Sequence, residues 1–440
     1  MTHEEILSRA QALAPELTKI RRDFHHYAET GWFEMRTSSL IARRLTDLGY
    51  EVQVGTAVCK ADERMGLPSS EELEAHYQWA AEHGADPEFL PATRGGFTGV
   101  IGTLRCGEGP TVALRFDIDA LGVQECDDDT HLPHREGFDS VTPGVMHACG
   151  HDGHAAIGLG AAMLLKELKD ELHGTVKLIF QPAEEGVRGA KSVVAAGHLD
   201  GADYALAAHI FPAGKVEGFA GVGILKEGAP GMLATAKLDA TFHGRPAHAG
   251  IAPQEGKNAL LAAATAVLNL HAIPRYGNVP TQLNVGVLHA GTGRNVVCDR
   301  ASLEIEVRGQ TTEANDYMYS RALTILKSAA DMYDCTLETR TMGSSSSMDC
   351  TWQLSERVEK VCAEELGQRV IRIGALGGGS EDFAYMAQRV QNQGGEASYV
   401  GLMCACPAKN HNSSFDFAEQ ALPNGAAMFA AVTCSLLRKP

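Results

Sequence analysis

Apolar and polar residues alternate along the chain with two different periods. A helical period runs from Glu4 to Leu48 and returns at 154–169 and 352–366. Nearly continuous apolar runs lie between and after these segments, and such runs are typical of strands buried on both faces: 112–119, 174–182, 204–211 and 397–405. Strands and helices that follow one another in this way predict an α/β fold, with helices flanking a mixed or parallel sheet.

The pattern changes after residue 228. Three segments alternate apolar and polar residues, as strands do when one face meets solvent, and two others have a helical period. We therefore predict an inserted α+β domain at 229–341, between a first part (1–228) and a second part (342–440) of the main domain. The Ser-rich segment from Met342 to Asp349 is the expected linker back to the main domain.

Composition excludes several classes of function. The chain has 440 residues and a formal net charge of −17, which argues against binding to nucleic acid or to an anionic membrane surface. No apolar run approaches the roughly 18 residues of a membrane span, and the N-terminus lacks the pattern of a secretory signal. The 11 cysteines form no CxxC pair, which favours a reducing cytoplasmic location.

Chemistry concentrates in the sequence MHACGHDGH at 146–154. Cys149 and His151 stand two residues apart, and a thiolate with an imidazole suits zinc or a neighbouring transition metal. The alternative is a buried thiol beside hydrogen-bonded loop histidines, and these nine residues alone leave both interpretations open.

A second cluster favours the metal site. Glu184 and Glu185 follow the apolar strand at 174–182, where a solvated acidic turn is not expected, and adjacent acids point in different directions. His209 in an apolar strand and His411 in a polar loop are weak signals individually, since a core histidine and a loop histidine are both common. Together these side chains offer enough ligands for two ions that share one group.

Seven motifs point to one protein family. FDIDAL, MHACGHDGH, PAEEG, AAHI, HGRPAHAG, GRNVV and GGSEDF resemble the metal-dependent aminoacylase, hippurate hydrolase and carboxypeptidase amidohydrolase family. The resemblance implies a two-domain metallopeptidase fold in which the insertion is a lid or dimerisation domain. It also implies two divalent ions, manganese or zinc, with Glu184 as the general base for a metal-activated water. The ligands it implies are Cys149, His151, Glu185, His209 and His411.

The resemblance assigns further roles outside this cluster. His248 matches a histidine that stabilises the tetrahedral oxyanion and that in relatives reaches the site of a neighbouring subunit. Asn295 and Arg308 match the pair that binds the substrate carboxylate, and we expect a tight turn to bring them onto adjacent strands. Arg294 is a rival for this task, and Asp117 is expected to orient a ligand histidine. For His248, Asn295 and Arg308, the alternative role is that of an exposed turn residue or a surface charge. For Asp117, the alternative role is structural capping.

The activity implied by the resemblance is cleavage of p-aminobenzoyl-glutamate to p-aminobenzoate and glutamate. One alternative is a broader hydrolase of N-acyl amino acids, of the hippurate hydrolase or aminoacylase type. Another is a non-catalytic subunit that only assembles a complex, although a complete ligand set beside Glu184 argues against it. The expected partners are a small acyl amino acid and a second subunit of the same fold, in a homodimer or a heteromer.

Overall fold

A computed structural model describes residues 1–213, 220–229, 231–374 and 379–439 of the protein. The chain divides into two compact units. The first unit comprises Met1–Gly231, Asp349–Gly377 and Tyr385–Pro440, and the second comprises Met232–Met348 and Gly378–Ala384. Gly378, the first residue of the motif GGSEDF, lies outside the described residues.

The N-terminal helical pattern folds as two helices, α1 (His3–His26) and α2 (Met35–Asp47). The turn between them contains Gly31 and Trp32, and Trp32 has a φ of 72°, which a right-handed helix cannot accommodate. The sequence pattern therefore predicts helix correctly on both sides of this turn but does not reveal the turn itself.

The first unit is built on a mixed sheet whose described strands follow the order β1-β2-β4-β3-β5-β12-β6-β11. The central strands β4, β3, β5 and β12 run parallel, whereas β2 and β6 pair antiparallel with β4 and β12. The strands are β1 (Glu51–Val54), β2 (Val100–Arg105), β3 (Thr111–Asp117), β4 (Thr175–Gln181), β5 (Tyr204–Pro212), β6 (Ala220–Leu225), β11 (Val370–Ile373) and β12 (Glu396–Cys404).

Three helices pack against one another and form the core with the sheet: α1, α5 (His151–Glu167) and α11 (Ala421–Leu437). Close packing depends on small residues, since Gly158 of α5 lies against the rings of Phe116 and Phe180 on β3 and β4. On the same unit α9 (Trp352–Lys360) contacts β12 and β6 and continues as a π-helical turn, Val361–Glu365. The remaining helices are α4 (Leu132–Glu136), α6 (Ala190–Ala195) and α10 (Phe383–Gln391).

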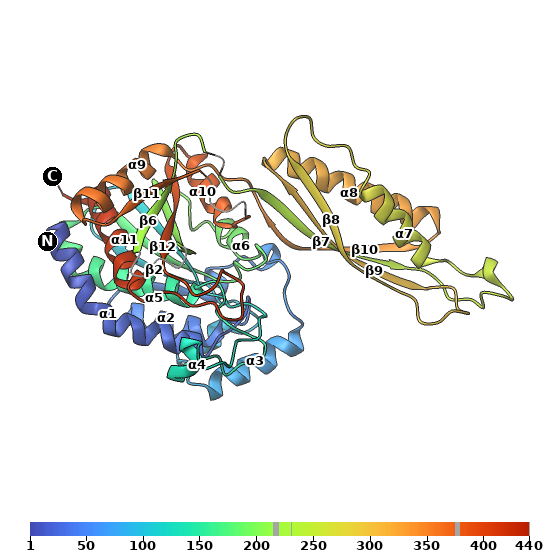
Figure 1. Cartoon of the computed structure of the whole chain (residues 1–440), viewed down its shortest axis with the longest axis horizontal. Coiled ribbons are helices and arrows are strands. Elements are labelled where there is room, and N and C mark those ends of the chain that lie inside the picture. The colour runs from blue at the N-terminus through green and yellow to red at the C-terminus, as the bar shows by residue number, and fades with distance from the viewer. Residues whose placement is uncertain (214–219, 230, 375–378, 440) are drawn as a thin grey trace. The chain divides into compact units, whose positions relative to one another are not determined.

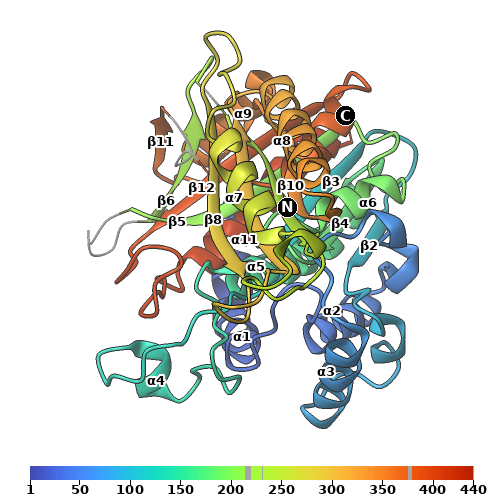
Figure 2. The same cartoon turned by 90° about the vertical axis from the view of Figure 1, so that its right-hand side faces the viewer.

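The polar stretch after β1 folds over α2. Its main element is α3 (Ser70–Glu82), which begins with a capping box between Ser69 and Glu72 and packs against α2 (Figure 2). Short 3₁₀ turns lead into and out of this region.

The second unit is a four-stranded antiparallel sheet with two helices on one face (Figure 1). Its strand order is β10-β7-β9-β8, and its strands are β7 (Ala234–His243), β8 (Thr281–Ala290), β9 (Arg300–Gly309) and β10 (Thr336–Ser345). The helices are α7 (Ala259–Leu270) and α8 (Thr312–Met332). The first half of the Ser-rich segment is not a linker, because Gly343 to Ser345 pair with β7 and complete β10.

Within the described ranges, no helix combines the length and the apolar character needed to cross a membrane.

Candidate metal centre and active site

The predicted ligands gather where the central strands of the first sheet end. β3 ends at Asp117, Glu184 and Glu185 follow the end of β4, and His209 lies near the end of β5. From β3 the chain crosses to β4 on one side and then to β5 on the other side of β3. Such a reversal opens a crevice at the carboxyl ends of the strands, which is where α/β proteins bind their ligands.

A left-handed glycine sets the geometry of Cys149 and His151. Gly150 has a φ of 86° and caps the N-terminus of α5, so that Cys149 precedes the turn and His151 begins the helix. The Cys149 Sγ lies 3.3 Å from Nε2 of His209, and both side chains are buried. The side chains of these three residues therefore face one point.

The loop after β4 holds its two glutamates in a strained conformation. Ala183 and Val187 both have positive φ, 52° and 59°, which costs energy for residues other than glycine and is frequent at functional sites. The Asp119 carboxylate secures the loop, because its two oxygens accept the backbone N–H groups of Glu184 (3.0 Å) and Glu185 (2.9 Å).

Glu185 lies between two of the predicted histidine ligands. Its Oε1 is 4.0 Å from Nε2 of His151 and 3.5 Å from Nε2 of His411. The His411 backbone N–H donates to the carbonyl of Ala148, which ties the C-terminal loop to the Cys149 turn. The side chain of His411 is 57% exposed, so the cluster opens to solvent on that side.

These residues fit a metal site. Their ligand atoms form overlapping groups in which all atoms lie within 4.8 Å of one another, and Cys149, His151 and Glu185 each belong to more than one group. The groups include Cys149–His151–His209, Cys149–Glu185–His411 and His151–Glu184–Glu185. Within the described ranges, Nε2 of His151 and Oε1 of Glu185 are buried without a hydrogen-bond partner, which is costly unless a cation binds between them.

The electrostatics of the site favour the binding of a cation. Burial, reinforced by Glu185, raises the pKa of the Cys149 thiol to about 12, so a nearby cation is needed for the thiolate that binds metal. Burial disfavours charge on His151, but Asp117 and Asp119 outweigh it and raise the pKa of that imidazole well above its ordinary value. Burial lowers the pKa of His209 well below the ordinary range, which keeps this imidazole neutral.

The contact expected of Asp117 is made by Asp119. Nδ1 of His151 lies 3.3 Å from Oδ1 of Asp119, whereas Asp117 hydrogen bonds to Nδ1 of His154 and lies 3.9 Å from Nε2 of His151. Nε2 of His154 accepts the backbone N–H of Ile210 at 2.8 Å. Both ring nitrogens of His154 are thus occupied, so this histidine aligns β5 and is not available to bind an ion.

Charged residues beneath the site connect α5 to α1. Asp152, next to His151, accepts hydrogen bonds from Arg21 (2.7 Å) and His25 (2.8 Å), and all three are fully buried. His25 also lies 2.9 Å from Glu125. Burial alone would lower the pKa of His25, but hydrogen bonds to these two carboxylates raise it to about 9. The network is not visible in the sequence, since its members lie far apart along the chain.

His248, Asn295 and Arg308 belong to the second unit. His248 pairs with Val296, which places it beside Asn295 in the loops at the Arg300 end of β9. Arg308 lies at the other end of β9, roughly 26 Å farther along at about 3.3 Å per residue. The expected tight turn between Asn295 and Arg308 is therefore wrong: one strand separates them, whereas Arg294 directly precedes Asn295.

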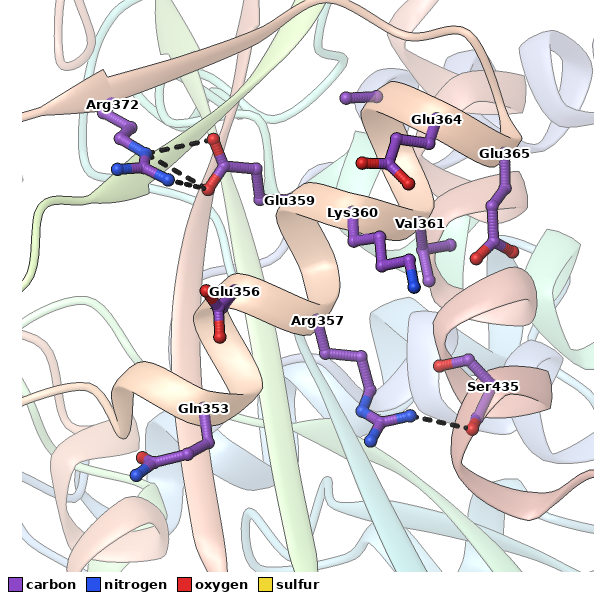
Figure 3. Close-up of a pocket in the computed structure, with 11 residues that line it drawn as sticks. Gln353, Glu356, Arg357, Glu359, Lys360, Val361, Glu364, Glu365, Arg372 and Ser435 are labelled. Carbon is purple, nitrogen blue, oxygen red and sulfur yellow. Dashed lines mark hydrogen bonds and ion pairs between the residues drawn. The ribbon is translucent and has the colours of Figure 1, made fainter.

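A separate hollow of about 650 Å³ lies along α9 and the π-helical turn (Figure 3). No residue of the metal cluster lines it. Its arginines have partners, because Arg372 pairs with Glu359 (2.8 Å) and Arg357 donates to the carbonyl of Ser435 (3.0 Å). The candidate active site is therefore the cluster at the strand ends and not this hollow.

Thiol, imidazole and carboxylate groups that converge at the strand ends of an α/β sheet, beside a further carboxylate, define the class of metal-dependent hydrolases. The chain belongs to peptidase family M20/M25/M40, whose sequence profile matches residues 113–434. The predicted fold class and the predicted hydrolase class are both confirmed by this match and by structural likeness.

Two relatives are similar over nearly the whole chain. The chain is 48% identical over 418 residues to an indole-3-acetyl-aspartic acid hydrolase of Enterobacter agglomerans, with 93% of each chain covered. It is 46% identical over 417 residues to one subunit of the p-aminobenzoyl-glutamate hydrolase of Escherichia coli K12, again with 93% of each chain covered. Hydrolases of acyl amino acids are thus its relatives.

Two solved structures share the fold. An aminobenzoyl-glutamate utilization protein from Klebsiella pneumoniae matches with a TM-score of 0.81 and 39% identity, covering 97% of each chain. A Bacillus subtilis dinuclear metal-binding peptidase of the M20 family matches with a TM-score of 0.66 and 25% identity, covering 97% of this chain and 99% of the other.

Proposed function

We propose that the chain hydrolyses the amide bond of p-aminobenzoyl-glutamate and releases p-aminobenzoate and glutamate. The observation that carries the proposal is the position of Glu184. This carboxylate stands beside a cluster of five ligands, on a loop that Asp119 holds by two backbone hydrogen bonds. A structural or storage site for metal would not need a further carboxylate held in this way.

The ligand set we propose is Cys149, His151, Glu185, His209 and His411, with room for two ions of manganese or zinc. Bound there, the ions would lower the pKa of water and polarise the scissile carbonyl. Glu184 would accept the proton of the attacking water and deliver it to the leaving nitrogen. Asp119 would orient His151 and hold the backbone of Glu184 and Glu185 in position. Asp117 would contribute indirectly, by orienting His154.

The second unit would complete the substrate site. We assign His248 to the oxyanion and Asn295 and Arg308 to the free carboxylate of the substrate. Because β9 separates Arg308 from the other two, these groups would reach one substrate only if two chains contribute. We also propose that the inserted domain, with boundaries predicted near residues 228 and 341, is the lid and dimerisation domain.

A surface on the second unit suits a second chain of the same fold. Leu260, Leu261 and Leu268 of α7 are exposed, Leu268 by 75%, and their spacing places them along one side of the helix. β8 is an edge strand of the adjacent sheet, with Leu288 exposed. An apolar stripe beside an unpaired edge favours a protein interface over solvent. All eleven cysteines are free thiols, which supports our proposal of a cytoplasmic location.

A second substrate also has support. The two relatives differ in the acyl group of their names, p-aminobenzoyl and indole-3-acetyl, but both names contain an acidic amino acid. A broader amidohydrolase that accepts several acyl groups on glutamate or aspartate is therefore the second candidate. Both candidates predict a requirement for a divalent metal.

The test is release of p-aminobenzoate from p-aminobenzoyl-glutamate by the purified full chain supplied with manganese. We expect release that a chelator stops and that added manganese restores. Cleavage of indole-3-acetyl-aspartate or hippurate in preference would support the second candidate. A chain that cleaves none of these compounds, with metal bound, would contradict the enzymatic proposal and favour the non-catalytic subunit.

A further inference from the structure

Arg188 lies close to the metal cluster and has no carboxylate within ion-pair distance among the described residues. The chain has 55 acidic and 38 basic residues, and many arginines of the first unit form ion pairs, Arg9, Arg21 and Arg36 among them. In so acidic a chain, a guanidinium without an ion-pair partner is suited to bind an anionic group of a ligand.

The guanidinium of Arg188 is held in place by backbone carbonyls. Its Nε donates to the carbonyl of Glu185 (2.8 Å) and Nη1 donates to the carbonyl of Gly66 (3.3 Å). Its Nη2 lies against Gly31, where a Cβ would be only 2.2 Å away. Because Gly31 has no side chain, there is space beside it for the planar guanidinium. The backbone carbonyls are neutral, so they orient the guanidinium without compensating its charge.

These contacts keep Arg188 beside the proposed active site. Glu185, which anchors Nε, is itself a candidate ligand, and the Asp119 carboxylate binds the amides of Glu184 and Glu185. The segment that carries Gly31 is in turn joined to the Asp119 loop through the bridge between Thr30 and Ala120. Arg188 therefore contacts both the loop that carries Glu184 and the segment at Gly31.

A second cation contacts the same segment. Arg64 stacks on Phe97, with its guanidinium carbon 3.5 Å from the ring centroid, and lies 5.6 Å from the ring of Trp32. Its Nη1 donates to a backbone carbonyl, and its Nε is buried without a partner in the described part of the chain. No described carboxylate forms an ion pair with it either. Arg64 therefore adds positive potential around Gly31 and Trp32.

We propose that Arg188 is a specificity-determining residue that binds the side-chain carboxylate of a dicarboxylic amino acid in the substrate. This inference rests on the proposed function and adds to it, because Asn295 and Arg308 were assigned to the carboxylate that every acyl amino acid carries. A carboxylate that reaches a fixed guanidinium forms charge-assisted hydrogen bonds that a neutral side chain cannot replace.

The experiment compares p-aminobenzoyl-glutamate with p-aminobenzoyl-glutamine, which differ only in the charge of the side chain. In the manganese-loaded full chain, kcat/KM should favour the glutamate compound. In Arg188→Gln this preference should fall by about tenfold or more, mainly through KM, and Arg188→Lys should retain part of it. Lys191→Gln is the matched control, since Lys191 is a nearby cation already paired with Glu63 at 3.0 Å; it should keep the native ratio.

The possible results distinguish the role of Arg188 from the amidohydrolase activity itself. If Arg188→Gln slows both compounds equally, Arg188 only supports the Glu185 loop and the inference is overturned. A native chain that treats the two compounds alike overturns it as well, while the amidohydrolase proposal stands. A chain that cleaves neither compound overturns both this inference and the proposed cleavage of p-aminobenzoyl-glutamate.

Discussion

Among single residues, Glu184 has the sharpest assigned role. Replacing it with Gln keeps the size of the side chain and removes the base, so kcat should fall by at least about 100-fold. The five proposed ligands are unchanged, so metal content measured on the purified variant should match the native chain. Glu167→Gln, on the surface beside Arg9, is the control and should keep full activity. Retained activity in Glu184→Gln would remove Glu184 as the base.

Asp119 should be needed for the site although we do not assign it as a ligand. In Asp119→Asn the amide NH₂ would face one of the two backbone N–H groups that the carboxylate now accepts, and the loop should lose its anchor. We expect metal affinity to fall by roughly 10- to 100-fold, measured by titration of the metal-free chain. Asp47→Asn, on the exposed face of α2, should leave it unchanged; an unaltered affinity in Asp119→Asn would contradict this role.

At this scale, the sequence identified the side chains that meet but not all of the contacts that hold them. The ligand types around Cys149 and His151, the two acids after a strand at Glu184 and Glu185, and the family resemblance together predicted one cluster. Asp119 was visible as the second acid of the strand-end motif, yet its double hydrogen bond depends on the loop conformation of Ala183. Nothing in local sequence connects Arg188 to Gly31, because their contact forms only after folding.

At the scale of elements, the packing of α5 on the sheet requires a glycine at position 158. Gly158→Ala should favour the helix by up to about 1 kcal/mol in an open position. Here the new Cβ would lie 2.7 Å from Phe116 and from Phe180, so we expect a net loss of roughly 1–3 kcal/mol in the free energy of unfolding. Denaturant titration measures it. Gly122→Ala, where a Cβ would meet nothing within 4 Å, is the control, and equal stability of both variants would refute this expectation.

Elements with one strong period were predicted well, and irregular ones were not. The buried strands β3, β4 and β5 match the continuous apolar runs within a few residues, because a strand covered on both faces consists almost entirely of apolar residues. The turn at Gly31 and Trp32 was not visible, since the apolar spacing continues through it. The Ser-rich segment resembled a linker because serine is common in loops, but β7 offered an edge that it could pair with.

For the whole molecule, stability should depend on pH through His25. Its pKa is about 9 in the folded chain and about 6.5 when unfolded. Because the folded value is the higher one, this stabilisation is complete below pH 6.5 and is lost as the pH rises through 9, with a maximum of roughly 3 kcal/mol. Unfolding measured at pH 6 and pH 9.5 should show a smaller drop in His25→Asn than in the native chain. An equal drop would exclude His25 as the source.

Assembly of two chains is the other property of the whole molecule that can be tested. Leu268→Glu places a charge in the exposed stripe of α7 and should yield monomers in sedimentation experiments. Loss of assembly should also lower the activity, because His248 and Arg308 of one chain lie at opposite ends of β9. Met332→Glu changes another exposed apolar residue, 66% exposed at the end of α8, and should remain assembled. A fully active Leu268→Glu monomer would show that one chain supplies the complete site.

The wide spacing of the ligands along the chain has a consequence for folding. Cys149 lies far along the chain from both His209 and His411, which belong to different ligand groups. Ions that join Cys149 to each of them would therefore close long loops, much as covalent cross-links would. An ion that binds only the folded chain adds about 1.4 kcal/mol to the free energy of unfolding for each tenfold rise in free metal above its Kd. Metal supply would then set how long the protein survives in the cell as well as how fast it works.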